Sequence, residues 1–301
     1  MGSENASSKC ARMLEVLRGA LIEAEIWRST YLSIKTARQK TSASEHEQGY
    51  LAVCRLATRC DGVFKSFKRN RHYSVVLEHV SEEQGREYLK AIKEEDEELL
   101  KNISKFQEND LLGSPITFHY DVGSFSPTTL RYVKVLADLK NIFGDLSGLD
   151  ICEIGGGYGG QCKIISDVFD VSSYTIIDLE TVIPLIRKYL ERLGVKNVVY
   201  LTQDQITESI EFDLVVSNYA FSECIRPVQD HYFDKILTKA HRGYITYNFV
   251  GAANETSPYN KEEIVERLSR KHAVRILDEK PRTAPTNFIL VWDDENPVVR
   301  K

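Results

Sequence analysis

The stretch Leu149–Gln161, LDICEIGGGYGGQ, decides the fold of this chain. An apolar run over residues 149–154 predicts a strand, and it leads into a glycine-rich turn that opens a helix near Cys162 and Ile164. Glycines let the backbone turn sharply and approach a ligand closely, and the N-terminus of a helix attracts anions and other acceptors. The stretch therefore predicts a strand–turn–helix unit that binds a nucleotide.

Two binding motifs overlap in this turn. Gly155, Gly157 and Gly160 fit the G-x-G-x-x-G pattern of dinucleotide sites. Glu153 followed by Gly155, Gly157 and Gly159 fits the E-x-G-x-G-x-G turn of S-adenosylmethionine (SAM) methyltransferases. The glycines alone leave the choice between the two cofactors open.

Length and composition describe an ordinary globular protein. The 301 residues can form one large α/β domain with a helical extension, or two domains. A net charge of -5 argues against a general nucleic-acid binder, which would normally be basic. No apolar run approaches the length of a membrane span, and the N-terminus lacks the apolar core of a signal peptide. The six cysteines show neither a paired framework nor metal-ligand spacing, so we expect a reducing cytoplasm.

Residues 1–112 predict an N-terminal helical region that caps the site or mediates dimerisation. From about residue 9 to residue 40, apolar residues recur at three- and four-residue steps, as expected for one face of a helix. This stripe could pack inside the protomer or against a second copy in a homodimer. Further helices are predicted over residues 48–63 and from Ser81, where a capping box begins. The stripe consists of Leu14, Leu17, Leu21, Ala24, Trp27, Tyr31 and Ile34.

Residues 113–147 predict a connecting lid segment and a helix. The segment is extended over residues 115–121, and the helix has Pro127 in its first turn, a position that proline favours. A loop that contains histidine, tyrosine and aspartate just before a nucleotide-binding fold is a plausible substrate wall.

Residues 148–301 predict a parallel sheet covered by helices on both faces, because strands and helices alternate there. No helix fits between the last two strands, so the final strand should be antiparallel. We therefore expect an α/β, Rossmann-like sheet of seven strands, the arrangement of SAM methyltransferases. The strands are predicted near residues 149–154, 174–178, 197–202, 212–217, 242–249, 273–278 and 287–292, and the helices near 159–169, 180–193, 228–240 and 260–271.

Carboxylates at the ends of the predicted strands favour SAM. In open α/β sheets, ligands bind at the carboxyl ends of the strands. Asp178, which follows the second strand, could accept both ribose hydroxyls of an adenosine, or it could cap the helix that starts at Leu179. A buried Glu153 needs donors, such as the N–H groups of the turn or the cationic end of a methionine. Asp204 and Gln205 suit an adenine amino group, with a plain surface turn as the alternative.

A nicotinamide enzyme of the short-chain, sugar-modifying type would need Y-x-x-x-K downstream of the glycines. The one match, Tyr31 with Lys35, lies far upstream, in the predicted helical region.

With these residues in place, the chain resembles the sugar O-methyltransferases of bacterial polysaccharide and antibiotic clusters, over roughly residues 60–292. The resemblance implies SAM as cofactor, S-adenosylhomocysteine (SAH) as product and a sugar-containing substrate. The matching blocks are Asn109–Asp110, Gly113–Pro115, Ser126–Tyr132, Glu153–Gln161, Ser217–Glu223, Arg242–Tyr244, Pro285–Phe288 and Val291–Trp292.

The expected cofactor site extends beyond the carboxylates. Asn218 and Tyr219 would hold the methionine end or the acceptor, and Tyr158 would cover the cofactor. Arg131 could meet the cofactor's carboxylate, or it could form a salt bridge on a helix surface. The full expected set is Arg131, Glu153, Gly155, Gly156, Gly157, Tyr158, Gln161, Asp178, Leu179, Asp204, Gln205, Asn218 and Tyr219.

The chemistry needs a base, because a sugar hydroxyl is too weakly acidic to ionise at neutral pH. Glu223, after the fourth strand, is the first candidate, followed by His119 before the sheet and His231 in the next helix, and each could instead be a surface or structural group. We expect the acidic run 293–295 to be a solvated tail and predict no metal site, although the metal requirement stays open. The alternatives are a small non-sugar acceptor, a non-catalytic SAM-fold subunit and a nicotinamide enzyme.

Overall fold

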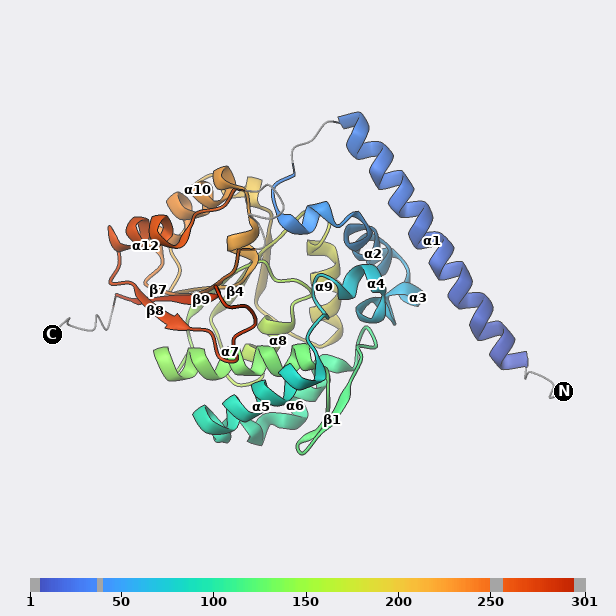
Figure 1. The fold of residues 1–301 in the computed structure, drawn as a ribbon, viewed down its shortest axis with the longest axis horizontal. Helices are drawn as coiled ribbons and strands as arrows, with labels where there is room; N and C mark the ends of the chain where they lie inside the picture. The colour runs from blue at the N-terminus through green and yellow to red at the C-terminus, as the bar shows by residue number, and fades with distance from the viewer. Residues whose placement is uncertain (1–5, 37–39, 250–256, 295–301) are drawn as a thin grey trace.

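A computed structural model of the chain describes residues 6–36, 40–249 and 257–294 (Figure 1). Its central sheet has seven strands in the order β5-β4-β3-β6-β7-β9-β8. The first five strands along the chain are parallel, whereas β9 pairs antiparallel with β7 and with β8. The strands are β3 (Asp150–Ile154), β4 (Ser173–Ile177), β5 (Val198–Leu201), β6 (Leu214–Asn218), β7 (Arg242–Tyr247), β8 (Arg275–Asp278) and β9 (Phe288–Asp293). The predicted Rossmann-like sheet of seven strands, with its antiparallel last strand, is confirmed.

Strand order places the glycine turn at the centre of the sheet. After β3 the chain adds β4 and β5 on one side of β3 and then returns to add β6 on the other side. The order in which the strands are added to the sheet therefore reverses at β3. Ligands of open α/β sheets bind at such a switch point, outside the carboxyl ends of the strands. The turn after Ile154 and the ends of β4 and β6 therefore surround one crevice.

Each face of the sheet has its own apolar core, because successive strand residues point to opposite faces. On one face, Ile151 and Ile176 pack with helices α8 (Gly160–Ser166) and α9 (Ile183–Arg192). On the other, Cys152 packs with α10 (Arg226–Lys235) and α12 (Lys261–Ser269). The predicted helix over residues 228–240 is instead divided into α10 and the short η7 (Leu237–Lys239).

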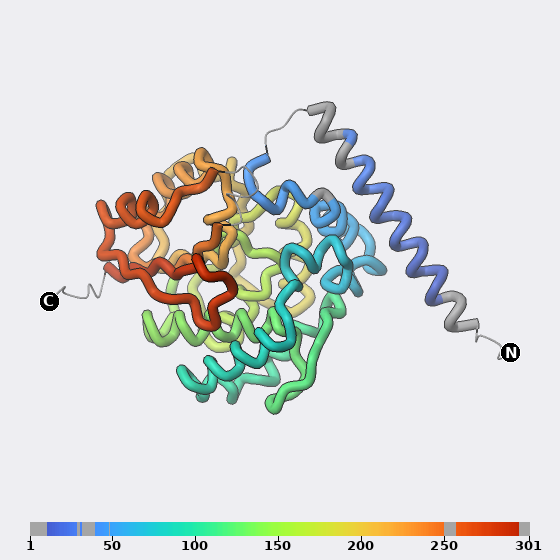
Figure 2. The backbone as a smooth tube through the Cα atoms, in the orientation of Figure 1, coloured from blue at the N-terminus to red at the C-terminus, as the bar shows by residue number. Residues whose placement is uncertain are grey.

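The N-terminal helical region is present (Figure 2). Its Ser81–Gln84 capping box forms as predicted. The predicted helix over residues 48–63 breaks at Cys60, whose backbone is extended. The elements are α1 (Ala6–Thr36), η1 (Ala43–His46), α2 (Gln48–Arg59), α3 (Asp61–Phe64), η2 (Phe67–Arg69), α4 (Arg71–Ser74), α5 (Glu82–Asp96), η3 (Glu97–Asn102), α6 (Ile103–Gln107) and η4 (Glu108–Asp110).

Helix α7 (Pro127–Phe143) joins this region to the sheet. It begins with Pro127 in its first turn, as predicted, and the Ser126 hydroxyl accepts from the backbone N–H of Thr128. Most of its residues are buried, and Leu130 and Leu136 belong to the same core cluster as α5 and the sheet. The predicted extended segment before it is a hairpin of β1 (Phe118–Tyr120) and β2 (Gly123–Phe125). The division at residues 112 and 147 stays a prediction.

Membrane-spanning helices and metal-binding groups are both absent from the residues that the structure describes. None of their helices is long and apolar enough to cross a membrane. Within the same ranges, no group of three or more histidine, cysteine, aspartate or glutamate side chains could hold a metal ion.

Candidate functional site

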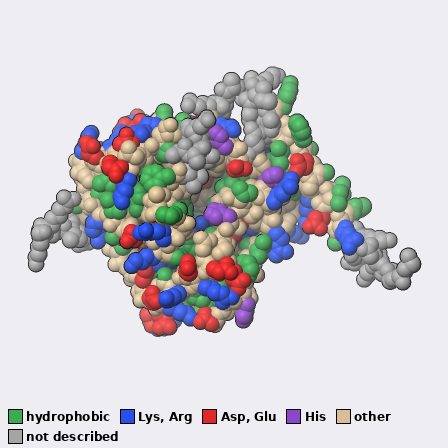
Figure 3. Space-filling model, viewed as in Figure 1, with side chains coloured by type: hydrophobic (Ala, Val, Ile, Leu, Met, Phe, Trp, Pro, Cys, Tyr) green, Lys and Arg blue, Asp and Glu red, His purple; other side chains and the backbone are tan. Residues whose placement is uncertain are grey.

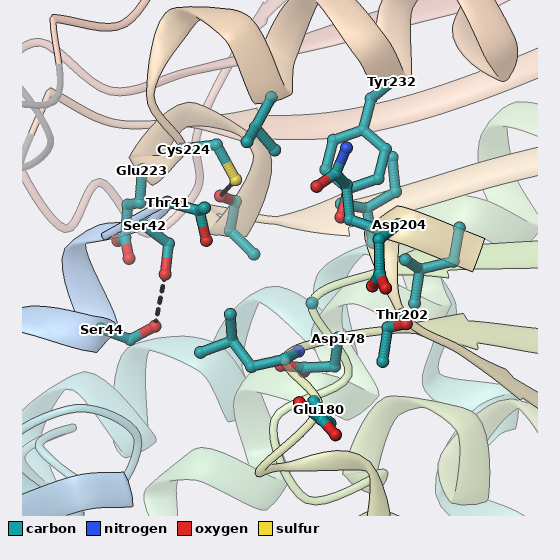
Figure 4. A pocket seen from close by; sticks show the side chains of 17 residues that line it. Thr41, Ser42, Ser44, Asp178, Glu180, Thr202, Asp204, Glu223, Cys224 and Tyr232 are labelled. Atoms are coloured by element: carbon teal, nitrogen blue, oxygen red, sulfur yellow. Dashed lines mark hydrogen bonds between the residues drawn. The ribbon is translucent and has the colours of Figure 1, made fainter. Parts of the chain in front are cut away.

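A cavity of about 230 Å³ lies at the carboxyl edge of the sheet (Figure 4). Asp178 and Glu180 line it after β4, and Asp204 lines it after β5. Glu223 lines it from the loop after β6, on the same side as Cys224. Its other lining residues are Thr41, Ser42, Ser44, Ile154, Gly155, Ile177, Leu179, Thr202, Gln203, Ala220, Val228 and Tyr232.

A second cavity, of about 110 Å³, adjoins the first. Both are lined by Ser44, Gly155, Asp178, Ala220 and Glu223. The second one continues along the glycine turn and beneath the N-terminal region, where its lining also includes Tyr50, Val76, Leu77, Arg131, Tyr132, Glu153, Gly157, Asn218 and Tyr219. A third cavity, of about 20 Å³, is lined by Arg131, Asn218 and Tyr219 as well.

The glycine turn comes close to the loop after β6. Gly155 has a φ of 83°, and a Cβ atom built on it would lie 2.0 Å from the Cβ of Ala220. Real Cβ atoms never approach so closely, so only glycine fits here. The absence of a side chain at this position leaves the backbone of the turn open to both cavities.

Asp178 joins the turn to the end of β4. Its carboxylate accepts hydrogen bonds from the backbone N–H groups of Leu179, at 2.7 Å, and Gly157, at 3.1 Å. Burial raises the pKa of Asp178 to about 6, and these N–H groups lower it. Helix α9 begins only at Ile183, with Val182 as its N-cap, so Asp178 does not cap it. Asp178 thus links the end of β4 to the glycine turn at the point shared by both cavities.

Glu153 is buried inside β3 and lines the second cavity. One of its carboxylate oxygens accepts from the hydroxyl of Tyr174 at 3.0 Å. Burial raises the pKa of Glu153 to about 8, the Tyr174 hydrogen bond lowers it, and the negative charge of Asp178 raises it further. A cationic ligand group in the cavity would offset the cost of burying this charge.

Glu223 lines both larger cavities. It lies in η6 (Ala220–Glu223), and its carboxylate accepts from the Asn248 side-chain amide at 2.8 Å. Burial raises the pKa of Glu223, while the hydrogen bond from Asn248 and the charge of Arg131 lower it. Asn248 is itself held by Ser222, whose hydroxyl lies 2.9 Å from its amide oxygen.

Two residues that line the second cavity carry polar atoms without partners among the described residues. Arg131 is buried, its Nη2 lies 3.5 Å from the carbonyl of Leu77, and its Nε has no hydrogen-bond partner among the described residues. The Oδ1 atom of Asn218 is likewise buried and without a partner in those ranges. Tyr219, between Arg131 and Glu279, has a φ of 68°, which is rare for a residue with a side chain and is often found at functional sites.

Several expected site residues lie elsewhere. Tyr158 is fully buried among aromatic rings, with Lys68 Nζ 3.8 Å from its ring centroid, so it belongs to the core and does not cover a cofactor. Gln161 is buried, and its side-chain oxygen accepts a hydrogen bond from the side-chain amide of Asn218 at 3.3 Å. Gln205 forms the capping box of η5 (Gln203–Gln205). Gly156 packs against the side chain of Ile176.

Neither histidine lines the cavities described above. His119 is exposed on β1, with Nδ1 3.4 Å from the hydroxyl of Ser124. His231 lies in α10 and its Nε2 is buried without a partner among the described residues. Of the three expected bases, the structure brings only Glu223 to the cofactor crevice.

The cavity also includes residues that the sequence did not suggest. Thr41, Ser42 and Ser44 come from the segment after α1, where Ser42 forms an isolated bridge with Cys224. Nothing local to this polar segment marks it as part of a site, because its partner lies far along the chain. Glu180 and Thr202, by contrast, lie at or near the ends of the strands predicted over residues 174–178 and 197–202, and that position was a usable signal.

Comparisons with known proteins give distant structural likenesses and no sequence match. No protein-family model and no curated protein sequence matches the chain. Solved structures similar to it include a magnesium protoporphyrin IX methyltransferase from Synechocystis with bound SAH (16% identity, TM-score 0.42, 54% of this chain and 80% of that chain). They also include an N-methyltransferase from Bradyrhizobium japonicum with SAH (15%, 0.43, 54% and 83%) and an rRNA methylase from Streptococcus thermophilus (14%, 0.36, 49% and 88%). At these scores we take nothing about cofactor or acceptor from them.

Proposed function

We propose that this chain is a SAM-dependent O-methyltransferase that methylates a sugar hydroxyl. The observation that carries the proposal is the placement of three carboxyl groups around one crevice, the buried Glu153 and the half-buried Asp178 and Glu223. Glu153, Asp178 and Glu223 line adjoining cavities beside a glycine turn, at the switch point of a seven-stranded sheet.

The residues around the crevice suit this cofactor. Asp178 would accept the ribose hydroxyls, and Asp204, at the far end of the larger cavity, would accept the adenine amino group. Glu153 would face the ammonium group of the methionine moiety, and the unpartnered Nε of Arg131 would donate to its carboxylate. The ammonium and the carboxylate of the methionine moiety would thus each meet a side chain that can carry the opposite charge.

When bound, SAM supplies an electrophilic methyl group attached to a sulfonium. The protein must hold the acceptor hydroxyl in line with that group and remove its proton. Glu223 is the proposed base, because its carboxylate lines both cavities and burial raises its pKa, which makes it a stronger proton acceptor. Asn248 holds one of its oxygens and leaves the other free to accept the proton.

The proposal of a sugar acceptor rests on the sequence resemblance. The blocks 126–132, 153–161 and 217–223 that carry it include Arg131, the glycine turn, Asn218 and Glu223, which border the crevice. The same crevice could serve a small phenol, amine or carboxylate, and acceptor assays distinguish these outcomes.

Two measurements test the proposal. Calorimetric titration of the full chain with SAH and, separately, with NAD should give binding to SAH alone. Incubation with SAM and a panel of glycans, nucleotide sugars and small phenols, followed by mass spectrometry, should give a mass gain of one methyl group on a sugar. Binding to NAD alone would overturn the cofactor assignment, and methylation only of phenols would overturn the acceptor class. SAH binding with no turnover on any acceptor would point to a non-catalytic subunit.

A further inference from the structure

Helix α1 presents its apolar side to solvent. It packs on α2 through Ile22, which is buried, and Glu25 forms an ion pair with Arg55 of α2 at 2.9 Å. The opposite side of α1 carries large hydrophobic side chains, and hydrophobic atoms follow the outer edge of this helix in Figure 3. The exposed set is Met13, Leu14, Val16, Leu17, Leu21, Trp27 and Tyr31, with Trp27 74% exposed.

The exposed side of α1 contains a coiled-coil seam. Starting at Met13, the residues at steps of four and three are apolar through Tyr31, and all of them are exposed. This 4-3 spacing keeps one stripe of a helix against a partner helix over several turns. The seam, as we define it, consists of Met13, Leu17, Ala20, Ala24, Trp27 and Tyr31.

The seam is symmetric about position 22. In an antiparallel pair of α1 helices centred there, Ala20 faces Ala24, Leu17 faces Trp27, and Met13 faces Tyr31 of the other copy. A two-fold interface requires this reciprocity, in which one residue contacts a second and the second contacts the first. The antiparallel register pairs each bulky aromatic with a flexible aliphatic side chain, whereas a parallel register would oppose Trp27 to Trp27.

We propose that this seam binds the same seam of a second copy of the chain, forming an antiparallel homodimer through α1. At roughly 150–250 Å² for each aromatic side chain, the four large side chains of the seam offer on the order of 600 Å², and the exposed Leu14, Val16 and Leu21 flank them. One partner buries about 800 Å² in a standard protein interface.

The charges of α1 favour a protein partner over a lipid surface. Between residues 12 and 28, the part of α1 that carries most of the seam, three arginines are balanced by three glutamates, and the two lysines of the helix, Lys9 and Lys35, lie near its ends. Helices that lie on anionic membranes usually carry an excess of lysine and arginine on the polar face.

The mass of the full chain in solution tests the dimer. Light scattering after size-exclusion chromatography should give twice the chain mass for the wild type. Leu17→Glu should give the monomer mass with unchanged helical circular dichroism, because the residue is exposed within the protomer and glutamate is a good helix former. The matched control is Leu111→Glu, at an exposed leucine outside α1, which should leave the dimer intact. A wild-type monomer at all concentrations, or a dimer unaffected by Leu17→Glu, would overturn the proposal.

Disulfide trapping tests the register. In a background with Cys10→Ser and Cys60→Ser, Met13→Cys protein mixed with Tyr31→Cys protein should form a cross-linked dimer on mild oxidation. Met13→Cys protein alone should not, because in the antiparallel pair its two thiols would lie about 27 Å apart along the helix axes. Cross-linking of Met13→Cys protein with itself would establish a parallel pair and refute the antiparallel register.

Discussion

At the scale of single residues, three carboxyl groups define the crevice, the buried Glu153 and the half-buried Asp178 and Glu223, and desolvation raises the pKa of each. Their partners differ. Asp178 is held by two backbone N–H groups, Glu223 by the Asn248 amide, and Glu153 by the Tyr174 hydroxyl. Glu223 has a side-chain amide on one side and two cavities on the other, which suits proton transfer. Asp178 is fixed to the turn, which suits ligand binding.

Replacing Glu223 should remove the proposed general base without weakening cofactor binding. Glu223→Gln keeps the shape and can still bond to Asn248, but it cannot accept a proton. We expect turnover to fall at least about a hundredfold while SAH affinity, measured by calorimetry, stays within about threefold of the wild type. His231→Gln, which alters a residue outside the described cavities, is the control and should keep its turnover. Near-normal turnover of Glu223→Gln would remove this residue from the mechanism.

Glu153 should make the stability of the ligand-free protein depend on pH. Its pKa rises from 4.5 to about 8 on folding, so between these values the folded state binds more protons than the unfolded state. The free energy of unfolding should therefore fall as pH rises through this window, by up to about 1.4 kcal/mol per pH unit.

The variant Glu153→Gln has no such titration, so its free energy of unfolding should fall less between pH 5 and pH 8. Urea unfolding at both pH values measures the difference. Glu87→Gln, on the exposed side of α5, serves as the control and should follow the wild type. If the free energy of unfolding fell equally between the two pH values for Glu153→Gln and the wild type, burial would not be raising the pKa of Glu153.

At the scale of elements, the turn between β3 and α8 controls the crevice because it lies against η6. Gly155 has both a positive φ and the side chain of Ala220 next to it. Gly148, just before β3, also has a positive φ, of 77°, but a Cβ atom there would meet nothing within 4 Å. Comparing alanine substitutions at the two glycines therefore distinguishes the effect of a strained backbone from the effect of a steric clash.

Gly155→Ala should bind no SAH in calorimetry, because the new methyl group forces η6 and the turn apart. Gly148→Ala should bind SAH normally and lose only about 1–2 kcal/mol of stability from its left-handed backbone. Thermal unfolding measured alongside shows whether Gly155→Ala remains folded. Equal SAH affinities for the two variants would show that the close approach is not needed for binding.

At the scale of the whole molecule, the N-terminal region and the sheet share one core. Tyr88 and Ile92 of α5, Leu136 of α7 and Tyr189 of α9 belong to a single buried cluster. Lys68 extends this contact, with its Nζ 2.7 Å from the carbonyl of Asn109 and 3.2 Å from the hydroxyl of Tyr189. In this respect the N-terminal region is an integral layer of the fold.

A chain shortened to residues 148–301 should therefore fail to fold, although the sequence suggests a domain boundary there. Without α7 and α2, the apolar sides of α8 and α9, which pack on them, would face water. Size-exclusion chromatography should show aggregates, and thermal scans should lack a cooperative transition. A monodisperse, cooperatively melting fragment would show that the sheet domain folds by itself.

The sequence by itself determined the seven-stranded sheet, the glycine turn and the carboxylates at the strand ends. These features depend on neighbours in the chain, since apolar alternation, glycines and strand ends are all local patterns. Asp178 and Glu223 could be chosen because a residue just after a parallel strand must lie at the ligand-binding edge.

Only the tertiary structure decided which other residues join the site. It brought Thr41 and Ser44 to the cavity, buried Tyr158 in the core, and placed His119 on an exposed hairpin. It also turned the apolar stripe of α1 outward, where the sequence left two directions open. The physical reason is that these positions depend on how segments far apart in the chain pack together. The residue pattern of one segment does not specify which other segment it will contact.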